Sequence, residues 1–117
     1  MHNFKKLKIW TESMSLVTSV YKMTKVFPDF EKFGLVSQMN RSAVAIPSNI
    51  AEGSSKGSAK HFKRYLEDSL GSAFELETQL IIAFNEEYIS NETFIELETK
   101  IKKIQKMISG FQSGLGN

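Results

Sequence analysis

Four basic residues and three serines form the strongest candidate for binding chemistry in this sequence. They surround the start of a helix predicted at residues 58–87. The basic residues are Lys56, Lys60, Lys63 and Arg64, and the serines are Ser54, Ser55 and Ser58. The free N–H groups at a helix N-terminus favour phosphate, and neighbouring lysines add attraction. The sequence therefore predicts an anion site here, and the alternative is a solvated charged rim that keeps the protein soluble.

No arrangement for catalysis or metal binding accompanies these residues. The chain has no cysteine, which excludes disulfides, thiolate metal sites and cysteine nucleophiles. A di-iron helical bundle needs Glu-x-x-His pairs, but the residue three positions before His61 is Ser58 and the other histidine is His2. The run at residues 53–58 lacks the spacing of a Walker phosphate loop. We therefore predict a protein that is not an enzyme and uses no cofactor and no metal.

Apolar residues at alternating intervals of three and four predict four helices that position the basic residues. The clearest stripe in the third helix is Phe62, Leu66, Ser69, Ala73, Leu76, Leu80 and Ala83. The fourth helix has Phe94, Leu97, Ile101, Ile104, Ile108, Phe111 and Leu115. The stripe predicted for the first helix is Leu7, Trp10, Met14, Val17, Tyr21 and Thr24, and a less regular one in the second is Leu35, Met39, Ser42, Ile46, Ser48 and Ile50.

These stripes and short connections predict an all-α fold, an antiparallel up-down-up-down four-helix bundle. The helices are expected at about residues 5–26, 31–53, 58–87 and 91–113, in a single domain over 1–117. Pro47 lies inside the second helix and removes an amide donor there. It either kinks or tightens that helix, or splits it into two segments.

The net charge of +2 hides two oppositely charged regions. Nine acidic residues and no Lys or Arg lie between Glu67 and Glu98, and the rest of the chain has 15 basic and four acidic residues. Antiparallel packing would gather the bases at one end of the bundle and the acids at the other. The predicted contacts with RNA, DNA or another anion are Lys5, Lys6, Lys56, Lys60, Lys63, Arg64, Lys102, Lys103 and Lys106.

Two segments, residues 43–46 and 80–84, are apolar on more than one helix face. A helix that is apolar all round must be buried all round, and a four-helix bundle covers one side only. This pattern predicts self-association, with Val44, Ile81, Ile82 and Phe84 in the interface. The alternative is that a long loop or the C-terminal tail covers these residues.

The sequence has no recognisable signal peptide, since Trp10–Ser13 interrupts any apolar run behind the first lysines. No stretch approaches the roughly 18 apolar residues that cross a bilayer. We therefore expect a cytoplasmic protein without membrane contact.

Several short motifs resemble those of the bacterial 23S rRNA-intervening-sequence proteins. They include residues 20–28 (VYKMTKVFP), residues 33–35 with Gln38 and Arg41, the octapeptide IPSNIAEG at 46–53, and residues 71–80. The resemblance covers about residues 4–111 and implies a four-helix bundle that assembles into a ring-shaped homopentamer. It also implies kinship with the accessory protein of diversity-generating retroelements, whose basic pentamer binds nucleic acid. It supplies no catalytic residue.

The sequence therefore favours a non-enzymatic, oligomeric bundle that binds RNA or DNA through its basic end. The second hypothesis is a structural or protein-interaction scaffold without nucleic-acid binding.

Overall fold

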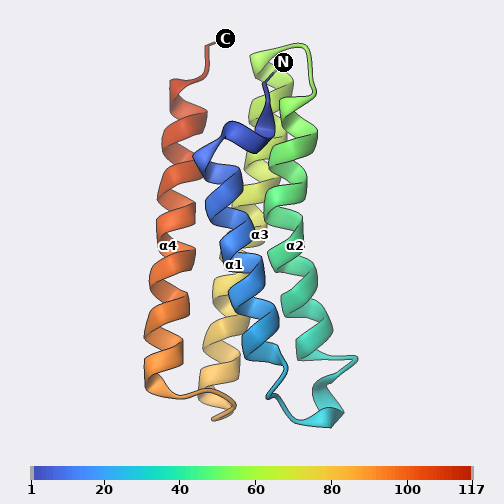
Figure 1. Ribbon diagram of the computed structural model, residues 1–117, viewed down its shortest axis with the longest axis vertical. Coiled ribbons are helices and arrows are strands. Elements are labelled where there is room, and N and C mark those ends of the chain that lie inside the picture. Colours follow the sequence, from blue (N-terminus) through green and yellow to red (C-terminus); the bar gives the residue numbers. More distant parts are fainter. Residues whose placement is uncertain (1, 117) are drawn as a thin grey trace.

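The computed structural model describes residues 2–116, which form helices and connecting turns without any strand. Four long helices make up the molecule: α1 (Lys8–Thr24), α2 (Leu35–Ser54), α3 (Ala59–Asn85) and α4 (Asn91–Gly114). Two short 3-10 helices, η1 (Phe4–Lys6) and η2 (Asp29–Glu31), precede α1 and α2 (Figure 1). The predicted all-α class with four helices is confirmed.

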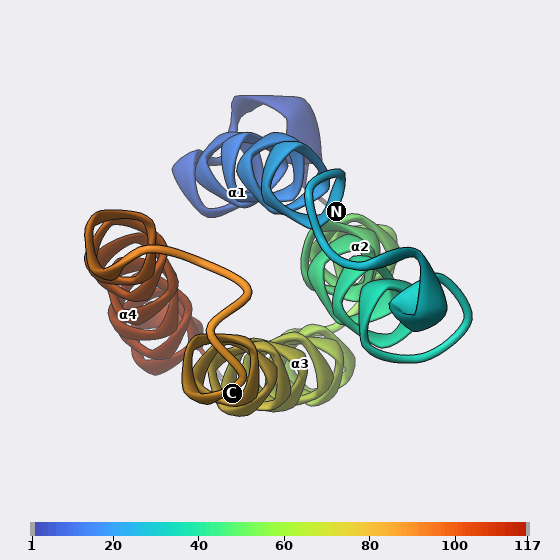
Figure 2. The same cartoon turned by 90° about the horizontal axis from the view of Figure 1, so that it is seen from below.

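Consecutive helices run in opposite directions along a body 45 Å long. The α2–α3 connection lies at the upper end in Figure 1, and the other two connections lie at the lower end. Each helix contacts two others, and α1 and α3 occupy diagonal corners (Figure 2). The contact between α2 and α3 is the most extensive, whereas a groove of about 520 Å³ opens between α1 and α4.

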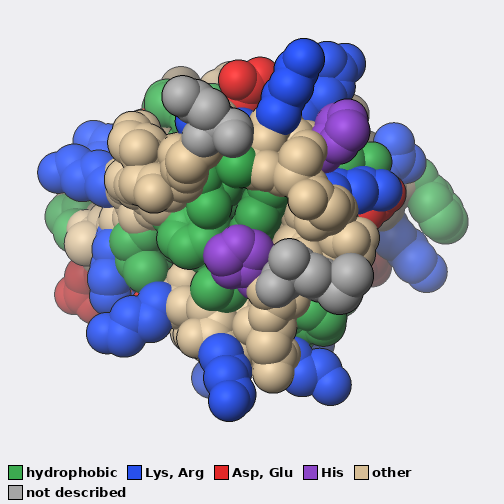
Figure 3. Space-filling view, turned by 90° about the horizontal axis from the view of Figure 1, so that it is seen from above, with side chains coloured by type: hydrophobic (Ala, Val, Ile, Leu, Met, Phe, Trp, Pro, Cys, Tyr) green, Lys and Arg blue, Asp and Glu red, His purple; other side chains and the backbone are tan. Residues whose placement is uncertain are grey.

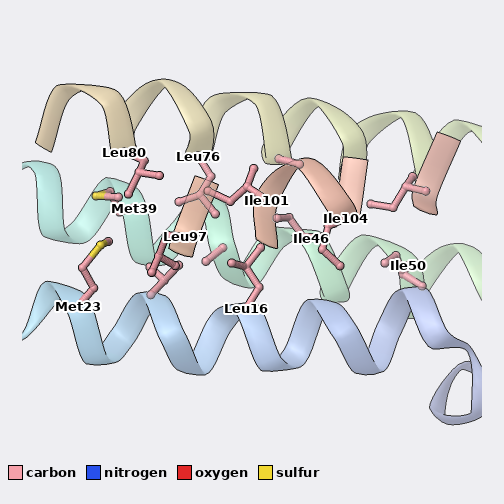
Figure 4. Close-up of a cluster of buried hydrophobic side chains, with 14 of the residues drawn as sticks. Leu16, Met23, Met39, Ile46, Ile50, Leu76, Leu80, Leu97, Ile101 and Ile104 are labelled. Carbon is pink, nitrogen blue, oxygen red and sulfur yellow. The ribbon is translucent and has the colours of Figure 1, made fainter. Parts of the chain in front are cut away.

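Aliphatic side chains from all four helices fill the space between them (Figure 4). The stripe predicted for α3 is confirmed, since each of its seven residues is buried. In α4 the residues from Leu97 to Ile108 of the predicted stripe are buried, and Phe94, Phe111 and Leu115 pack against the core from its ends. In α2 the predicted Ser48 is exposed, but the other stripe residues are buried.

The stripe predicted for the first helix is wrong by one residue in register. The stripe of α1 that is buried in the core consists of Ile9, Ser13, Leu16, Val20 and Met23, and Thr24 of the predicted stripe is also buried. The stripe from Ile9 to Met23 repeats at intervals of three and four, as do the predicted residues. The polar Ser13 makes it harder to recognise in the sequence. Met14 and Tyr21 of the predicted stripe are 41% and 44% exposed. Helix α1 therefore carries two adjacent apolar stripes. One is buried, whereas the other packs Leu7, Trp10 and Val17 against the edge of the core and leaves Met14 and Tyr21 exposed.

Pro47 lies within one continuous helix, so the alternative of a split second helix is wrong. Proline has no N–H for the carbonyl one turn earlier, which weakens the helix locally. Two side chains add hydrogen bonds around this point. Asn49 Nδ2 donates to the Ala45 carbonyl at 2.9 Å, and Ser69 Oγ from α3 donates to the Ile46 carbonyl at 2.9 Å. These bonds reinforce the turn that contains Pro47 and tie it to α3.

The end of α2 packs directly against the start of α3 at Gly53. A Cβ atom at this position would lie 2.7 Å from Tyr65 Cβ and 2.9 Å from Phe62 Cδ1, closer than packed atoms approach. Only glycine therefore allows the two helices to come this close. This packing explains the last residue of the octapeptide at 46–53.

The N-terminal residues close the upper end of the bundle. The His2 backbone N–H donates to the Ser54 carbonyl at 3.1 Å, and its ring contacts Phe62 and Phe111 edge-on. The first helix was predicted from residue 5, but α1 begins at Lys8, because residues 4–6 form the separate turn η1 that holds this segment over the helices.

At the lower end, Glu31 connects two turns. Its Oε1 accepts a hydrogen bond from the Leu35 backbone N–H at 3.0 Å, and its Oε2 accepts one from the Tyr88 hydroxyl at 2.9 Å. Because Glu31 caps α2 from outside the helix, α2 begins at Leu35 rather than at the predicted residue 31. Helix α3 ends at Asn85, two residues before the predicted end, since Glu87 adopts a left-handed conformation with φ of 63°.

Gly53→Ala tests the close approach of α2 and α3. We expect this variant to lose about 1–3 kcal/mol of stability, because the added methyl group must displace Tyr65 or Phe62. The measurement is urea unfolding at fixed protein concentration. Gly110→Ala is the matched control, since a Cβ there meets nothing within 4 Å and should stabilise the helix slightly. Equal stability of the two variants would contradict this packing.

The pKa of the Tyr88 hydroxyl provides a test of its contact with Glu31. Partial desolvation and the nearby Glu31 carboxylate raise the pKa of Tyr88 above its usual value of 10.0. Its stabilising contribution is therefore complete below pH 10.0 and is lost as the pH rises through the higher folded-state pKa. Subtracting the tyrosinate absorbance titration of Tyr88→Phe from that of the native chain isolates this group. Glu31→Gln should lower its pKa, and an unchanged pKa in that variant would refute the assignment.

Candidate nucleic-acid interface

Five cationic or titratable side chains gather at the upper end around the first turns of α3. Lys60, His61, Lys63 and Arg64 line an open hollow of about 730 Å³ together with Glu67 and Gly116. Lys56 reaches the same region from the α2–α3 connection, where it lines a second hollow together with His61, Arg64, Tyr65 and the acidic Asp68. Viewed from above, Lys and Arg side chains surround this end of the molecule (Figure 3).

A helix cap and a cation–π contact position the side chains of this cluster. Ser58 Oγ caps α3 by accepting the His61 backbone N–H at 3.3 Å, and the same Oγ lies 3.0 Å from His61 Nδ1. The ammonium group of Lys56 lies 5.0 Å from the centre of the Tyr65 ring, a cation–π contact that the sequence did not suggest. The cap starts the helix, and the ring holds Lys56 beside it.

The electrostatics of this cluster favour an anion. The ion pairs among residues 2–116 do not include Lys56, Lys60, Lys63 or Arg64. Positive side chains at a helix N-terminus are also disfavoured by the helix dipole, which is positive at that end. A bound phosphate group would relieve both the repulsion among the cations and their conflict with the dipole.

Lys5 and Lys6 lie at the same end on η1 and are exposed. Their segment is held by the His2 bond to Ser54 and by an edge-to-face contact of Phe4 with Trp10, whose ring centres are 5.2 Å apart. The structure therefore places these two predicted residues at the upper end with the α3 cluster.

The predicted lysines of α4 are placed differently. Lys102 and Lys103 are each at least 11 residues from both ends of α4, so they lie along the side of the bundle. Lys102 is 3.9 Å from Glu98, and Lys103 is 3.4 Å from Glu12 of α1. Lys106 is exposed one turn closer to the upper end. The cationic cluster of the upper end is thus smaller than the sequence suggested.

The predicted interface residues divide into two kinds. Val44, Ile81 and Ile82 are exposed, so no loop or tail within residues 2–116 covers them. Phe84 is half-buried, because its ring stacks on Phe94 of α4 with centres 4.5 Å apart. The alternative of an intramolecular cover is therefore wrong for the first three residues.

Other kinds of site receive little support from the described residues. Within residues 2–116 no three His, Asp or Glu side chains are grouped in a way that suits a metal ion. No helix in that range is both long enough and apolar enough to cross a membrane. Tyr88, whose pKa is raised by burial, lies at the end opposite the cationic cluster.

The fold defines an all-helical protein with four long helices, and sequence comparison places it in a family. The chain belongs to the 23S rRNA-intervening sequence protein family, whose sequence model matches residues 5–110. The resemblance of its motifs to this family is thereby confirmed. Comparison with curated proteins finds no match.

A solved structure has the same fold. It is the crystal structure, at 1.70 Å resolution, of a protein of unknown function from the S23 ribosomal protein family of Bacteroides thetaiotaomicron VPI-5482. The TM-score is 0.80 with 23% sequence identity, over 89% of this chain and 97% of the other. This similarity concerns the fold alone.

Proposed function

We propose that this protein is a non-enzymatic, nucleic-acid-binding bundle whose upper end contacts the phosphate backbone. The observation that carries the proposal is the cluster of Lys56, Lys60, Lys63 and Arg64 over the N-terminus of α3, none of which forms an ion pair within residues 2–116. Such a surface recognises charge and spacing rather than sequence. The open shape of the hollow suits an extended polymer better than a small enclosed ligand.

Self-association is the second part of the proposal. The exposed apolar residues on α2 and α3 support it, and the family resemblance favours a ring-shaped homopentamer. A cyclic ring of parallel bundles would present every upper end on one face. Several weak phosphate sites on one face would then act together on a single strand.

Charge reversal of the cluster tests nucleic-acid binding. We expect Lys60→Glu/Lys63→Glu/Arg64→Glu to weaken binding and to flatten the plot of log affinity against log salt by about two to three units, since each lost phosphate contact removes roughly 0.7–0.9 from the slope. The measurement is fluorescence anisotropy with single-stranded RNA and with duplex DNA at several salt concentrations.

The matched control is Lys22→Glu/Lys25→Glu/Lys32→Glu, which changes the net charge equally at the lower end. This control should retain most of the native slope. Equal slopes for the two triple variants, or no binding by the native protein at low salt, would contradict the proposed function.

Sedimentation velocity at micromolar concentration tests self-association independently. We expect a species several times larger than the 13.3 kDa chain, with a pentamer as the specific expectation. A 13.3 kDa species would refute this part of the proposal without affecting the charge-reversal test.

A protein-interaction scaffold is the second candidate function, and one observation favours it. Phe30 and Phe33 in the α1–α2 connection are 78% and 89% exposed. Exposed aromatic side chains are typical anchors of protein interfaces. This alternative predicts no salt-dependent binding to RNA or DNA, so the charge-reversal experiment separates the two functions.

A further inference from the structure

The second apolar stripe of α1 forms part of an uncharged face with α2. Trp10, Met14, Val17 and Tyr21 recur at intervals of four, three and four, and the first three lie on the side of α1 that adjoins α2. A groove of about 370 Å³ runs between the two helices. No charged residue lines this groove. The lining residues are Phe4, Trp10, Met14, Val17, Val44, Pro47, Ser48 and Ala51. This spacing is that of a seam between packed helices, yet Met14 and Val44 remain exposed.

A second uncharged face lies along α3. Gly71, Phe74, Thr78 and Ile81 recur at intervals of three, four and three, and each is exposed. Only two charges, Glu75 and Glu77, occur in the stretch from residue 69 to 85, which is about 24 Å long.

Both of these carboxylates are held toward neighbouring helices. Glu75 accepts a hydrogen bond from Ser42 of α2 at 2.9 Å, and Glu77 accepts one from Gln105 of α4 at 2.8 Å. The solvent-facing strip of α3 that lies between Glu75 and Glu77 therefore has no charged side chain. A monomer in water rarely keeps so long a strip uncharged, so this strip has the character of an interface.

The charged residues beside the two faces have opposite signs. Arg41 is the one charged residue between positions 35 and 51, it is exposed, and it takes part in none of the ion pairs among residues 2–116. Glu75 is the exposed acid beside the α3 strip. Arg41 precedes Val44 of the groove by one turn of α2, and Glu75 follows Phe74 on α3, so residues of opposite charge lie next to the two faces.

We infer that the α1–α2 face of one copy packs against the α3 face of a second copy. This inference rests on the proposed self-association and names the surfaces that produce it. Helices α1 and α3 lie on diagonal corners of the bundle, so both faces of one chain can be occupied at the same time (Figure 2). The contact is heterologous, and such contacts produce closed rings or open filaments rather than simple dimers.

The first test introduces a charge into the α3 face. Phe74→Lys is expected to convert the assembly to 13.3 kDa chains in sedimentation velocity, because the ammonium group would be buried between apolar side chains. Ile95→Lys on α4 is the matched control, since Phe74 and Ile95 are both 53% exposed, and it should stay assembled. Circular dichroism of both variants verifies that the helices remain folded. A folded Phe74→Lys that stays assembled would overturn the inference.

The second test identifies which faces meet, using the absence of cysteine from the chain. Thr18→Cys lies between Met14 and Tyr21, and Thr78→Cys lies between Phe74 and Ile81. When the two single variants are coexpressed and treated with a short bismaleimide, we expect covalent dimers. The double variant should give a ladder of larger covalent species, and each single variant alone should give none.

Thr99→Cys on α4 supplies the control for this experiment. All three threonines are exposed and donate a hydrogen bond to the carbonyl four residues earlier, so the substitutions are equivalent locally. Thr18→Cys coexpressed with Thr99→Cys should give no dimer. Crosslinking of a single variant to itself, or no product from the Thr18/Thr78 pair in an assembled protein, would refute this pairing. A monomeric native chain would instead refute self-association as a whole.

Discussion

The close approach of α2 and α3 at Gly53 is the constraint on which the upper end of the molecule depends. Because no side chain separates the helices there, the connection between them is short, and Ser58 can cap α3 immediately. The same corner presents the Ser54 carbonyl to the N-terminal segment. One packing contact therefore brings the α2–α3 connection, the first turns of α3 and the lysines of η1 to the same end of the bundle.

This arrangement determines where the charged residues of the sequence lie on the molecule. On α4, Lys102 and Lys103 are paired with acids along the side of the bundle, where exposed ion pairs contribute little. At the start of α3 the cations take part in none of the ion pairs that the described residues form, and they oppose the helix dipole. These cations outnumber the two acids that line the same hollows, Glu67 and Asp68, and we propose that a polyanion binds the excess positive charge.

The sequence predicted the fold well where one apolar stripe was regular. The stripes of α3 and α4 were identified because their intervals of three and four run unbroken from Phe62 to Ala83 and from Phe94 to Leu115. In α1 the prediction failed, since two stripes overlap and Ser13 weakens the one that faces the core. The positions of Lys5, Lys6 and the α3 cations at one end were also predicted, but helix direction alone could not show that Lys103 reaches Glu12, or that Lys56 lies over Tyr65. Both contacts join residues from different elements, and their geometry depends on packing.

Residue-level lysine acetylation measures directly whether the cations around the N-terminus of α3 contact nucleic acid. The acetylation rate of each lysine would be measured by mass spectrometry with and without single-stranded RNA at low salt. We expect slower acetylation of Lys56, Lys60 and Lys63 in the presence of RNA, with unchanged rates at Lys22, Lys25 and Lys32. Slower acetylation of Lys22, Lys25 and Lys32 in the presence of RNA would contradict a contact through the α3 cations. So would rates that RNA leaves unchanged at all six lysines.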